Sequence, residues 1–113
     1  MMRIEEIARS GAQIYSLHGK IMGGDACTLL RGKVAEALDS GARKLVIDLK
    51  HVDWMSSPGI SMMMSISRDI AKAGGRLKVA NITSIEKVLV ITRLTTQFEI
   101  HDSIDEAVNS FSG

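Results

Sequence analysis

Residues 45–60, with the sequence LVIDLKHVDWMSSPGI, decide the fold because they join a buried strand to the start of a long helix. The apolar run at 44–49 consists mostly of branched residues, which is typical of a strand buried on both faces of a sheet. Pro58, the only proline, fits the first turn of a helix, where the N–H that it lacks is not needed. The stretch therefore predicts a central strand, then a loop, and then a helix that is capped by Ser57 and runs to Ala73.

Two strands and a helix are expected before this stretch. Residues 2–8 fit a polar edge strand, and 13–17 fit a second strand because it is rich in apolar, β-prone residues between glycines. The Ser-Gly pair at 10–11 is typical of a hairpin turn. Asp25 follows two glycines and is expected to cap a helix over 27–38.

The chain after residue 73 repeats the alternation. It predicts a strand at 76–80, a short helix capped by Ser84, a strand at 97–101, and a last helix. Ser103 caps that last helix, with Glu106 completing a capping box. The expected order is β-β-α-β-α-β-α-β-α, which needs crossover connections and so favours an α/β fold with a mixed central sheet. All 113 residues are expected to form a single domain, 1–113.

Composition narrows the classes of function. The chain is 45% hydrophobic and 24% charged, as in globular proteins, and its net charge of +1 argues against nucleic-acid binding. The single cysteine, Cys27, allows no internal disulfide and is expected to be a small core residue. No signal peptide or membrane-spanning run is present, so we expect a cytoplasmic protein with no membrane contact.

Patterns of catalytic residues are missing. The sequence has neither GxGxxG nor a Walker A motif. His18, His51 and His101 lack partners at metal-ligand spacing, so no metal site and no cofactor is expected. His51, Asp53 and Ser57 lie close in sequence, but the elbow motif of a serine nucleophile is absent. The sequence therefore predicts no enzyme and no catalytic residue.

Ser57 is the most informative residue because it lies between a central strand and a long helix. A serine there can simply cap the helix. Alternatively, it can be phosphorylated, since the positive end of the helix dipole and free N–H groups accommodate a phosphate. The added charge would repel a partner surface that accepts the neutral hydroxyl, and binding would switch without refolding.

Three methionines follow on the predicted helix. Met62, Met63 and Met64 are consecutive and span about 300° of a helix, so they cannot all face the core. Methionine is adaptable and recurs at interaction surfaces, so some of Met62, Met64 and their neighbours are expected to be exposed beside Ser57. Alternatively, Met62 or Met64 is only half-buried against a neighbouring loop. The core face of this helix is expected to carry Ile60, Met63, Ile66, Ile70 and Ala71. Trp54 and Met55, in the preceding loop, raise the same question, with Trp54 expected to be packed.

Residues 45–60 resemble the signature of STAS domains, specifically the anti-sigma factor antagonists of bacteria. That signature is an apolar strand ending in Asp-Leu, then Val, two loop residues, an apolar residue, Asp-Ser-Ser/Thr-Gly and another apolar residue. Residues 73–81 (AGGRLKVAN) resemble the family's Gly-Gly strand entry, and 88–107 resemble its C-terminal half. Gly19 matches the glycine that ends the family's second strand.

The resemblance implies a phosphorylation-controlled partner switch. In that family the anti-sigma factor is also a serine kinase, of histidine-kinase-like ATPase type, and it phosphorylates the serine after the aspartate. A PP2C-type phosphatase removes the phosphate, and the unphosphorylated antagonist binds the kinase and frees the sigma factor. Carried across, Ser57 is the acceptor. The partner-binding residues that follow from this are Met22, Trp54, Met55, Ser56, Ser57, Pro58, Gly59 and Met62.

The sequence departs from the family pattern at three positions. Ser56 replaces the aspartate, Pro58 replaces the second serine or threonine, and Met22 stands where an acidic residue usually faces the partner. These changes remove negative charge from the expected partner surface and make Ser56 a second candidate acceptor. One alternative is a STAS scaffold or assembly subunit that is not phosphorylated. A nucleotide-binding STAS domain is a third reading, which rests on fold analogy alone.

Overall fold

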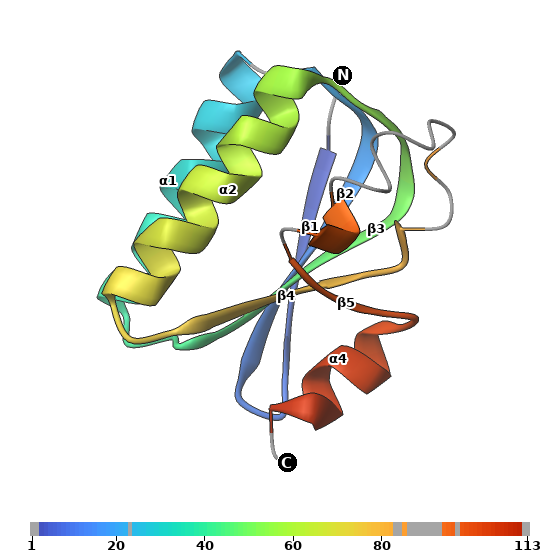
Figure 1. Cartoon of the computed structure of the whole chain (residues 1–113). Helices are drawn as coiled ribbons and strands as arrows, with labels where there is room; N and C mark the ends of the chain where they lie inside the picture. Colours follow the sequence, from blue (N-terminus) through green and yellow to red (C-terminus); the bar gives the residue numbers. More distant parts are fainter. Residues whose placement is uncertain (1–2, 23, 83–84, 86–93, 97, 112–113) are drawn as a thin grey trace.

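A five-stranded sheet forms the centre of the computed structural model, which describes residues 3–22, 24–82, 85, 94–96 and 98–111 (Figure 1). The strand order is β1-β2-β3-β4-β5, with β1 antiparallel to β2 and all other neighbours parallel. This confirms the expected mixed sheet. The strands are β1 (Arg3–Arg9), β2 (Ala12–Ile21), β3 (Lys44–Met55), β4 (Arg76–Ala80) and β5 (Glu99–His101).

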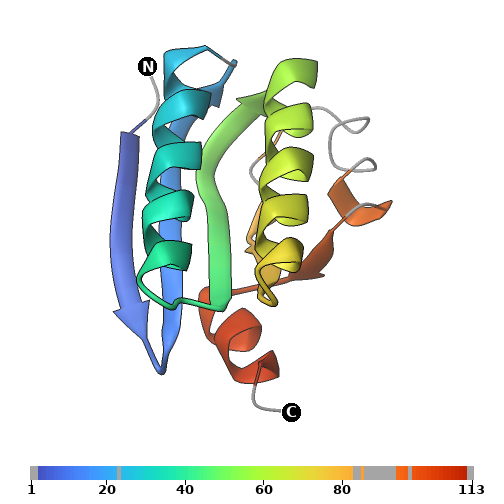
Figure 2. The same ribbon diagram turned by 90° about the vertical axis from the view of Figure 1, so that its left-hand side faces the viewer.

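Helices cover both faces of this sheet. The long helices α1 (Asp25–Asp39) and α2 (Ser57–Lys72) lie side by side on one face, and the short α4 (Ile104–Ser110) lies on the other (Figures 1 and 2). The observed order matches the expected alternation, with the third predicted helix, capped by Ser84, outside the described residues. Residues 94–96 are helical.

The two faces bury cores of different size. The larger core lies under α1 and α2 and includes Leu45, Ile47 and Leu49 of β3, none of which is exposed to solvent. Cys27 belongs to it, as expected. The smaller core lies under α4 and consists of Ala12, Ile14, Val46, Ala80, Ala107 and Val108. β3 contributes to both cores because successive side chains of a strand point to opposite faces.

β3 is longer than the sequence predicted. The expected loop from His51 to Met55 is wrong, because β3 continues to Met55 and pairs with β2 throughout. Two register shifts explain why the strand was missed: Ser16 to His18 faces Asp48 to His51, and Gly19 to Lys20 faces Val52 to Trp54. Each shift adds one residue to β3, as in a β-bulge, and so interrupts the period of two that marks a strand.

Asp25 does not cap α1, contrary to the prediction. The cap is Gly24, whose φ of 69° and ψ of −140° suit glycine, and α1 already includes Asp25. Ser103 does cap α4, since its Oγ accepts a hydrogen bond from the Glu106 N–H at 3.0 Å. The cap predicted at Ser103 is therefore confirmed.

Candidate functional site

The loop between β3 and α2 is held against the end of β2. The Ser56 N–H donates to the Ile21 carbonyl at 2.8 Å. A Cβ on Gly59 would lie 2.8 Å from that same carbonyl oxygen and 3.0 Å from Met55 Cγ. Only a glycine at 59 therefore lets the first turn of α2 pack this closely on β2, which fixes the position of Ser57.

Ser56, and not Ser57, caps α2. Its φ of −79° and ψ of 167° are extended, and its Oγ accepts a hydrogen bond from the Gly59 N–H at 3.2 Å. Ser57 is the first residue of the helix. The predicted cap is wrong by one position, because the serine that can reach the Gly59 N–H lies three residues before it, at position 56. Ser57 is exposed, with its hydroxyl not engaged in the cap.

The first turn of α2 offers few donors to an anion. Pro58 has no N–H, and the Gly59 N–H is already donated to Ser56. Among positions 57–59, this leaves the N–H of Ser57. The expected group of free N–H donors around Ser57 is therefore reduced to one. A phosphate on Ser57 would be stabilised mainly by the helix dipole and by water.

The predicted partner residues separate into exposed and buried ones. Met22, with 56% of its surface exposed, precedes α1, and Ser57 and Pro58 are exposed at the start of α2. Trp54 and Ser56 are half-buried. Three predicted contact residues lie in the interior instead: Met55, Gly59 and Met62.

The burial of Met62 contradicts the expectation that it would be exposed beside Ser57. Met62 is 6% exposed and belongs to the larger core, and Met63 is fully buried. Met64 is half-buried, which agrees with the alternative burial expected for one of these methionines. The buried face of α2 is two adjacent rows wide, so it holds two consecutive methionines. Ala71, expected in the core, is exposed.

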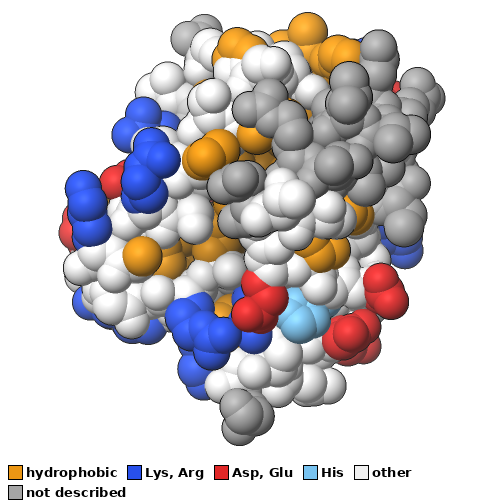
Figure 3. Space-filling model, viewed as in Figure 1, with side chains coloured by type: hydrophobic (Ala, Val, Ile, Leu, Met, Phe, Trp, Pro, Cys, Tyr) orange, Lys and Arg blue, Asp and Glu red, His pale blue; other side chains and the backbone are white. Residues whose placement is uncertain are grey.

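The surface around Ser57 is apolar rather than acidic. The first turn of α2 contains no acidic residue. The nearby carboxylate of Asp53 lies 3.5 Å from the Lys20 ammonium, which balances its charge. Figure 3 shows apolar side chains at the top of the molecule, where α2 begins, and charged side chains gathered lower on the same face.

Two of the three residues that suggested a triad, His51 and Asp53, have other partners. The His51 ring stacks on His18, with centroids 4.4 Å apart and an interplanar angle of 9°. Asp53 pairs with Lys20. In the described part of the chain, no three His, Cys, Asp or Glu side chains are grouped as metal ligands.

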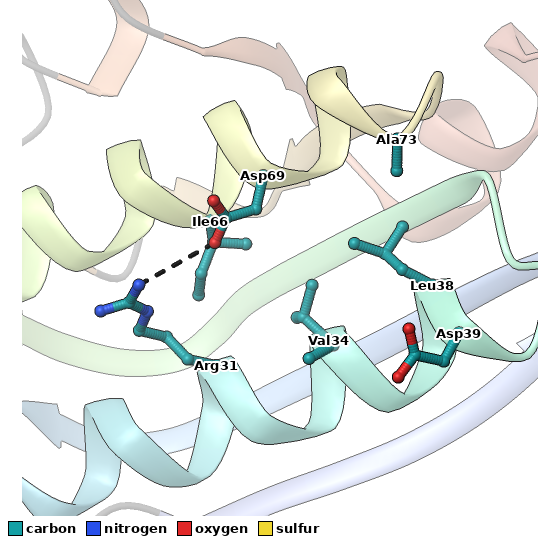
Figure 4. Close-up of a pocket in the computed structure, with 8 residues that line it drawn as sticks. Arg31, Val34, Leu38, Asp39, Ile66, Asp69 and Ala73 are labelled. Atoms are coloured by element: carbon teal, nitrogen blue, oxygen red, sulfur yellow. Dashed lines mark ion pairs between the residues drawn. The ribbon is translucent and has the colours of Figure 1, made fainter.

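A shallow depression lies between α1 and α2 (Figure 4). It has a volume of about 270 Å³ and is lined mainly by aliphatic side chains such as Val34, Leu38 and Ile66. The Arg31 guanidinium and the Asp69 carboxylate, 3.9 Å apart, meet across it. These two charges pair at the surface of the molecule.

Sequence reasoning did not single out Asp48, which organises the sheet behind the site. This carboxylate is 3% exposed and accepts hydrogen bonds from Ser16 Oγ at 2.9 Å, Asn81 Nδ2 at 2.8 Å and the Lys50 N–H at 3.1 Å. It thereby joins β2, the first bulge of β3 and the residue after β4. The Asp within an apolar strand was the available signal, since a buried carboxylate needs several donors.

Comparison with known proteins defines the family. The profile of the STAS domain matches residues 3–107, and the chain belongs to the STAS domain family. A relative named as an anti-sigma factor antagonist, BtrV of Bordetella bronchiseptica, is 24% identical over 102 residues, covering 89% of this chain and 87% of its own. A homologue from Thermotoga neapolitana with the same description is 28% identical over 79 residues, or 69% of this chain and 70% of its own.

Solved structures share the fold. The anti-sigma factor antagonist SpoIIAA in its unphosphorylated form superposes with a TM-score of 0.76 at 17% identity, covering 100% of this chain and 99% of its own. An antagonist from Thermotoga maritima gives a TM-score of 0.81 at 20% identity, covering 97% and 95%. Within the described residues, no helix is long and apolar enough to cross a membrane.

Proposed function

We propose that this protein is an anti-sigma factor antagonist whose binding to its partner is switched by phosphorylation of Ser57. The supporting observation is that the two serines at the start of α2 are in different environments. Ser56 makes the capping bond, so the exposed Ser57 hydroxyl can be modified without loss of the cap. The relatives named as anti-sigma factor antagonists favour the same class of function.

The proposed partner surface consists of Met22, Ser57 and Pro58, with the exposed parts of Trp54 and Ser56 at its border. A phosphate on Ser57 would add about two negative charges to an apolar surface. The first turn of α2 carries no acidic residue. A partner that covers this surface would have to desolvate the phosphate, which is costly without a paired cation. Phosphorylation would therefore release the partner.

The proposed partners are an anti-sigma factor that acts as the serine kinase and a PP2C-type phosphatase that reverses it. The loss of the aspartate at 56 and of an acid at 22 adapts the surface to a kinase that is less basic at the contact. The protein itself would have no catalytic role and would act in the cytoplasm.

Phosphosite mapping on protein recovered from its native cells tests the proposal, with co-purifying partners identified in the same sample. We expect phosphate on Ser57 and an ATPase-type kinase among the partners. Ser57→Ala should bind that kinase as the unmodified protein does, and Ser57→Asp should bind it at least tenfold more weakly. Equal affinity of the two variants would contradict the switch.

Ser56→Asp is the matched control, because it adds one negative charge at the neighbouring residue while keeping a capping side chain. If the partner responds to negative charge at position 57 in particular, Ser57→Asp should weaken binding more than Ser56→Asp. Phosphate on Ser56 would identify the second candidate acceptor instead. An unmodified protein found mainly with other STAS proteins would favour the scaffold alternative, which the altered SSPG sequence motivates.

A further inference from the structure

β1 is an uncovered edge of the sheet. Among the strands that the structure describes, its one neighbour is β2, and six of its seven residues are exposed, with Ile4 half-buried. Figure 2 shows β1 at the margin of the sheet, with no other described element beyond it. β5, the opposite edge, has only three residues. A long edge strand presents unpaired N–H and C=O groups to which another strand can bind.

The hairpin determines which residues of β1 direct these groups outward. Ser10 and Gly11 both have positive φ, of 53° and 80°, as in a two-residue type I′ turn. The closing pair of such a turn, Arg9 and Ala12, exchanges both hydrogen bonds, and bonded pairs alternate along the ladder. Arg9, Ile7 and Glu5 therefore bond to β2, whereas Ala8 and Glu6 direct their backbone groups to the free edge.

The side chains of Glu5, Ile7 and Arg9 share the face that α4 covers. Ile7 lies opposite Ile14 of the smaller core, and Arg9 forms an ion pair with Asp105 of α4. Ile7 is 41% exposed, although its neighbour Ile14 is fully buried. An acid, an isoleucine and a base thus alternate along the edge.

We propose that β1 pairs antiparallel with β1 of a second copy of this chain, about a two-fold axis at Ile7. In this register Glu6 and Ala8 of the two copies exchange backbone hydrogen bonds. Ile7 faces Ile7 of the second copy in a non-hydrogen-bonded pair, where side chains approach most closely. Glu5 faces Arg9 of the second copy on both sides of the axis.

Charge selects this register. In three antiparallel registers, the outward backbone groups of the two copies face each other and at least five residues of each β1 are paired. One of the other two sets Glu6 against Glu6 and Arg3 against Arg9, and the other sets Glu5 against Glu5. Like charges directly opposite each other are destabilising, and opposite charges are favourable. Only the register centred on Ile7 brings opposite charges together and covers the exposed isoleucine.

The proposed contact leaves the Ser57 surface free. The β1–β2 hairpin lies at the start of β2, whereas Ser57 follows the end of β3, and these are opposite ends of the sheet (Figure 1). Five residues a side form a contact smaller than a standard interface, so we expect a concentration-dependent equilibrium of monomer and dimer. The proposed dimer does not depend on the phosphorylation of Ser57, so either proposal can fail without the other.

Sedimentation equilibrium from micromolar to millimolar protein, combined with amide exchange, tests the dimer. The Glu6 and Ala8 amides should gain protection as concentration rises, whereas the Ile7 and Arg9 amides are protected by β2 at every concentration. Ala8→Pro removes an outward N–H without breaking the ladder to β2, and edge strands tolerate proline there. It should weaken dimerisation at least tenfold while the far-ultraviolet circular dichroism spectrum is retained.

A charge swap tests the register. Glu5→Arg and Arg9→Glu should each weaken self-association at least tenfold, because each places like charges opposite. Mixing the two variants should restore association, since both contacts are then between Arg and Glu. Asp105→Asn, which removes only the pair of Arg9 with α4, should dimerise as the unmodified protein does.

Three results would overturn the proposal. They are a monomer at millimolar concentration, a dimer as tight in Ala8→Pro as in the unmodified protein, and a charge-swapped mixture no tighter than its separate components.

Discussion

Ser56 and Ser57 are neighbours with separate physical roles. The Ser56 hydroxyl satisfies the Gly59 N–H and belongs to the fold, whereas the Ser57 hydroxyl faces solvent. This separation lets one serine be modified while the other keeps the helix in place. Under the proposed function, stability and partner binding can therefore be changed one at a time in this pair.

Ser56→Ala should destabilise the protein by about 1 kcal/mol, because the first turn of α2 loses its side-chain cap. Ser57→Ala should change stability by no more than about 0.5 kcal/mol, as is usual for exposed positions. Urea unfolding followed by circular dichroism measures both. A larger loss in Ser57→Ala than in Ser56→Ala would show that the cap has been assigned to the wrong serine.

Gly59 is required by a close approach of two backbones. In Gly59→Ala the new Cβ would meet the Ile21 carbonyl oxygen at 2.8 Å, and a backbone atom cannot simply rotate away. We expect a loss of about 1–3 kcal/mol, as for other overpacked sites. Gly32→Ala is the matched control, because nothing lies within 4 Å of its Cβ position in α1.

Gly32→Ala should stabilise the protein by up to about 1 kcal/mol, since alanine favours a helix interior. Urea unfolding of both variants gives the comparison. Similar effects of the two substitutions would contradict a specific contact between Gly59 and β2.

At the level of elements, sequence patterns located the strands and helices but not their ends. The apolar run at 44–49 gave β3 because both of its faces are buried. Its continuation to Met55 was hidden because two bulges interrupt the alternation. The cap of α2 was misplaced by one residue, since Ser56 and Ser57 are the same residue type and only backbone geometry separates them.

The candidate site was predicted unevenly for a related reason. Met22, Ser57 and Pro58 are exposed, and their role in partner binding stays a prediction. Met62 was misplaced because the width of the buried face of α2 depends on the elements packed against it, which periodicity does not reveal. Lys78 was also missed: it is 2% exposed although it is a lysine, because Glu99 and the Phe111 ring enclose its ammonium.

The contact between β4 and β5 should make stability depend on pH. A hydrogen bond from Lys78, followed by one from His101, lowers the pKa of Glu99 from 4.5 to about 2. The folded protein therefore favours the charged carboxylate. Its stabilising effect is present above the unfolded pKa and is lost as pH falls from 4.5 toward 2.

Glu99→Gln isolates this effect. The difference in the free energy of unfolding between the unmodified protein and Glu99→Gln should shrink as pH falls through that window. The change should be modest, because the Glu99 side chain is 44% exposed and solvent screens the pair. Urea unfolding at a series of pH values measures it, and a difference that stays constant with pH would contradict the assignment.

For the whole molecule, the sheet separates two cores of unequal size. α1 and α2 bury the larger one, and α4, with seven residues, closes the smaller one. Regions with few buried apolar contacts open before the molecule unfolds as a whole. We therefore expect α4 to open first, while β3, which belongs to both cores, opens last.

Val108→Ala and Val34→Ala form a matched pair that tests this order, since the same two methyl groups are removed from different cores. Val108 of α4 is 4% exposed, and Val34 of α1 is 2% exposed. Val108→Ala should lower the opening free energy of the α4 amides by about 1–2 kcal/mol, and that of the β3 amides by the same amount, because β3 opens only after α4. Val34→Ala should lower the opening free energy of the slowest amides, in β3, and leave that of the α4 amides unchanged. Native-state hydrogen exchange measures both, and equal acceleration of α4 and β3 in Val34→Ala would mean that the two cores unfold as one unit.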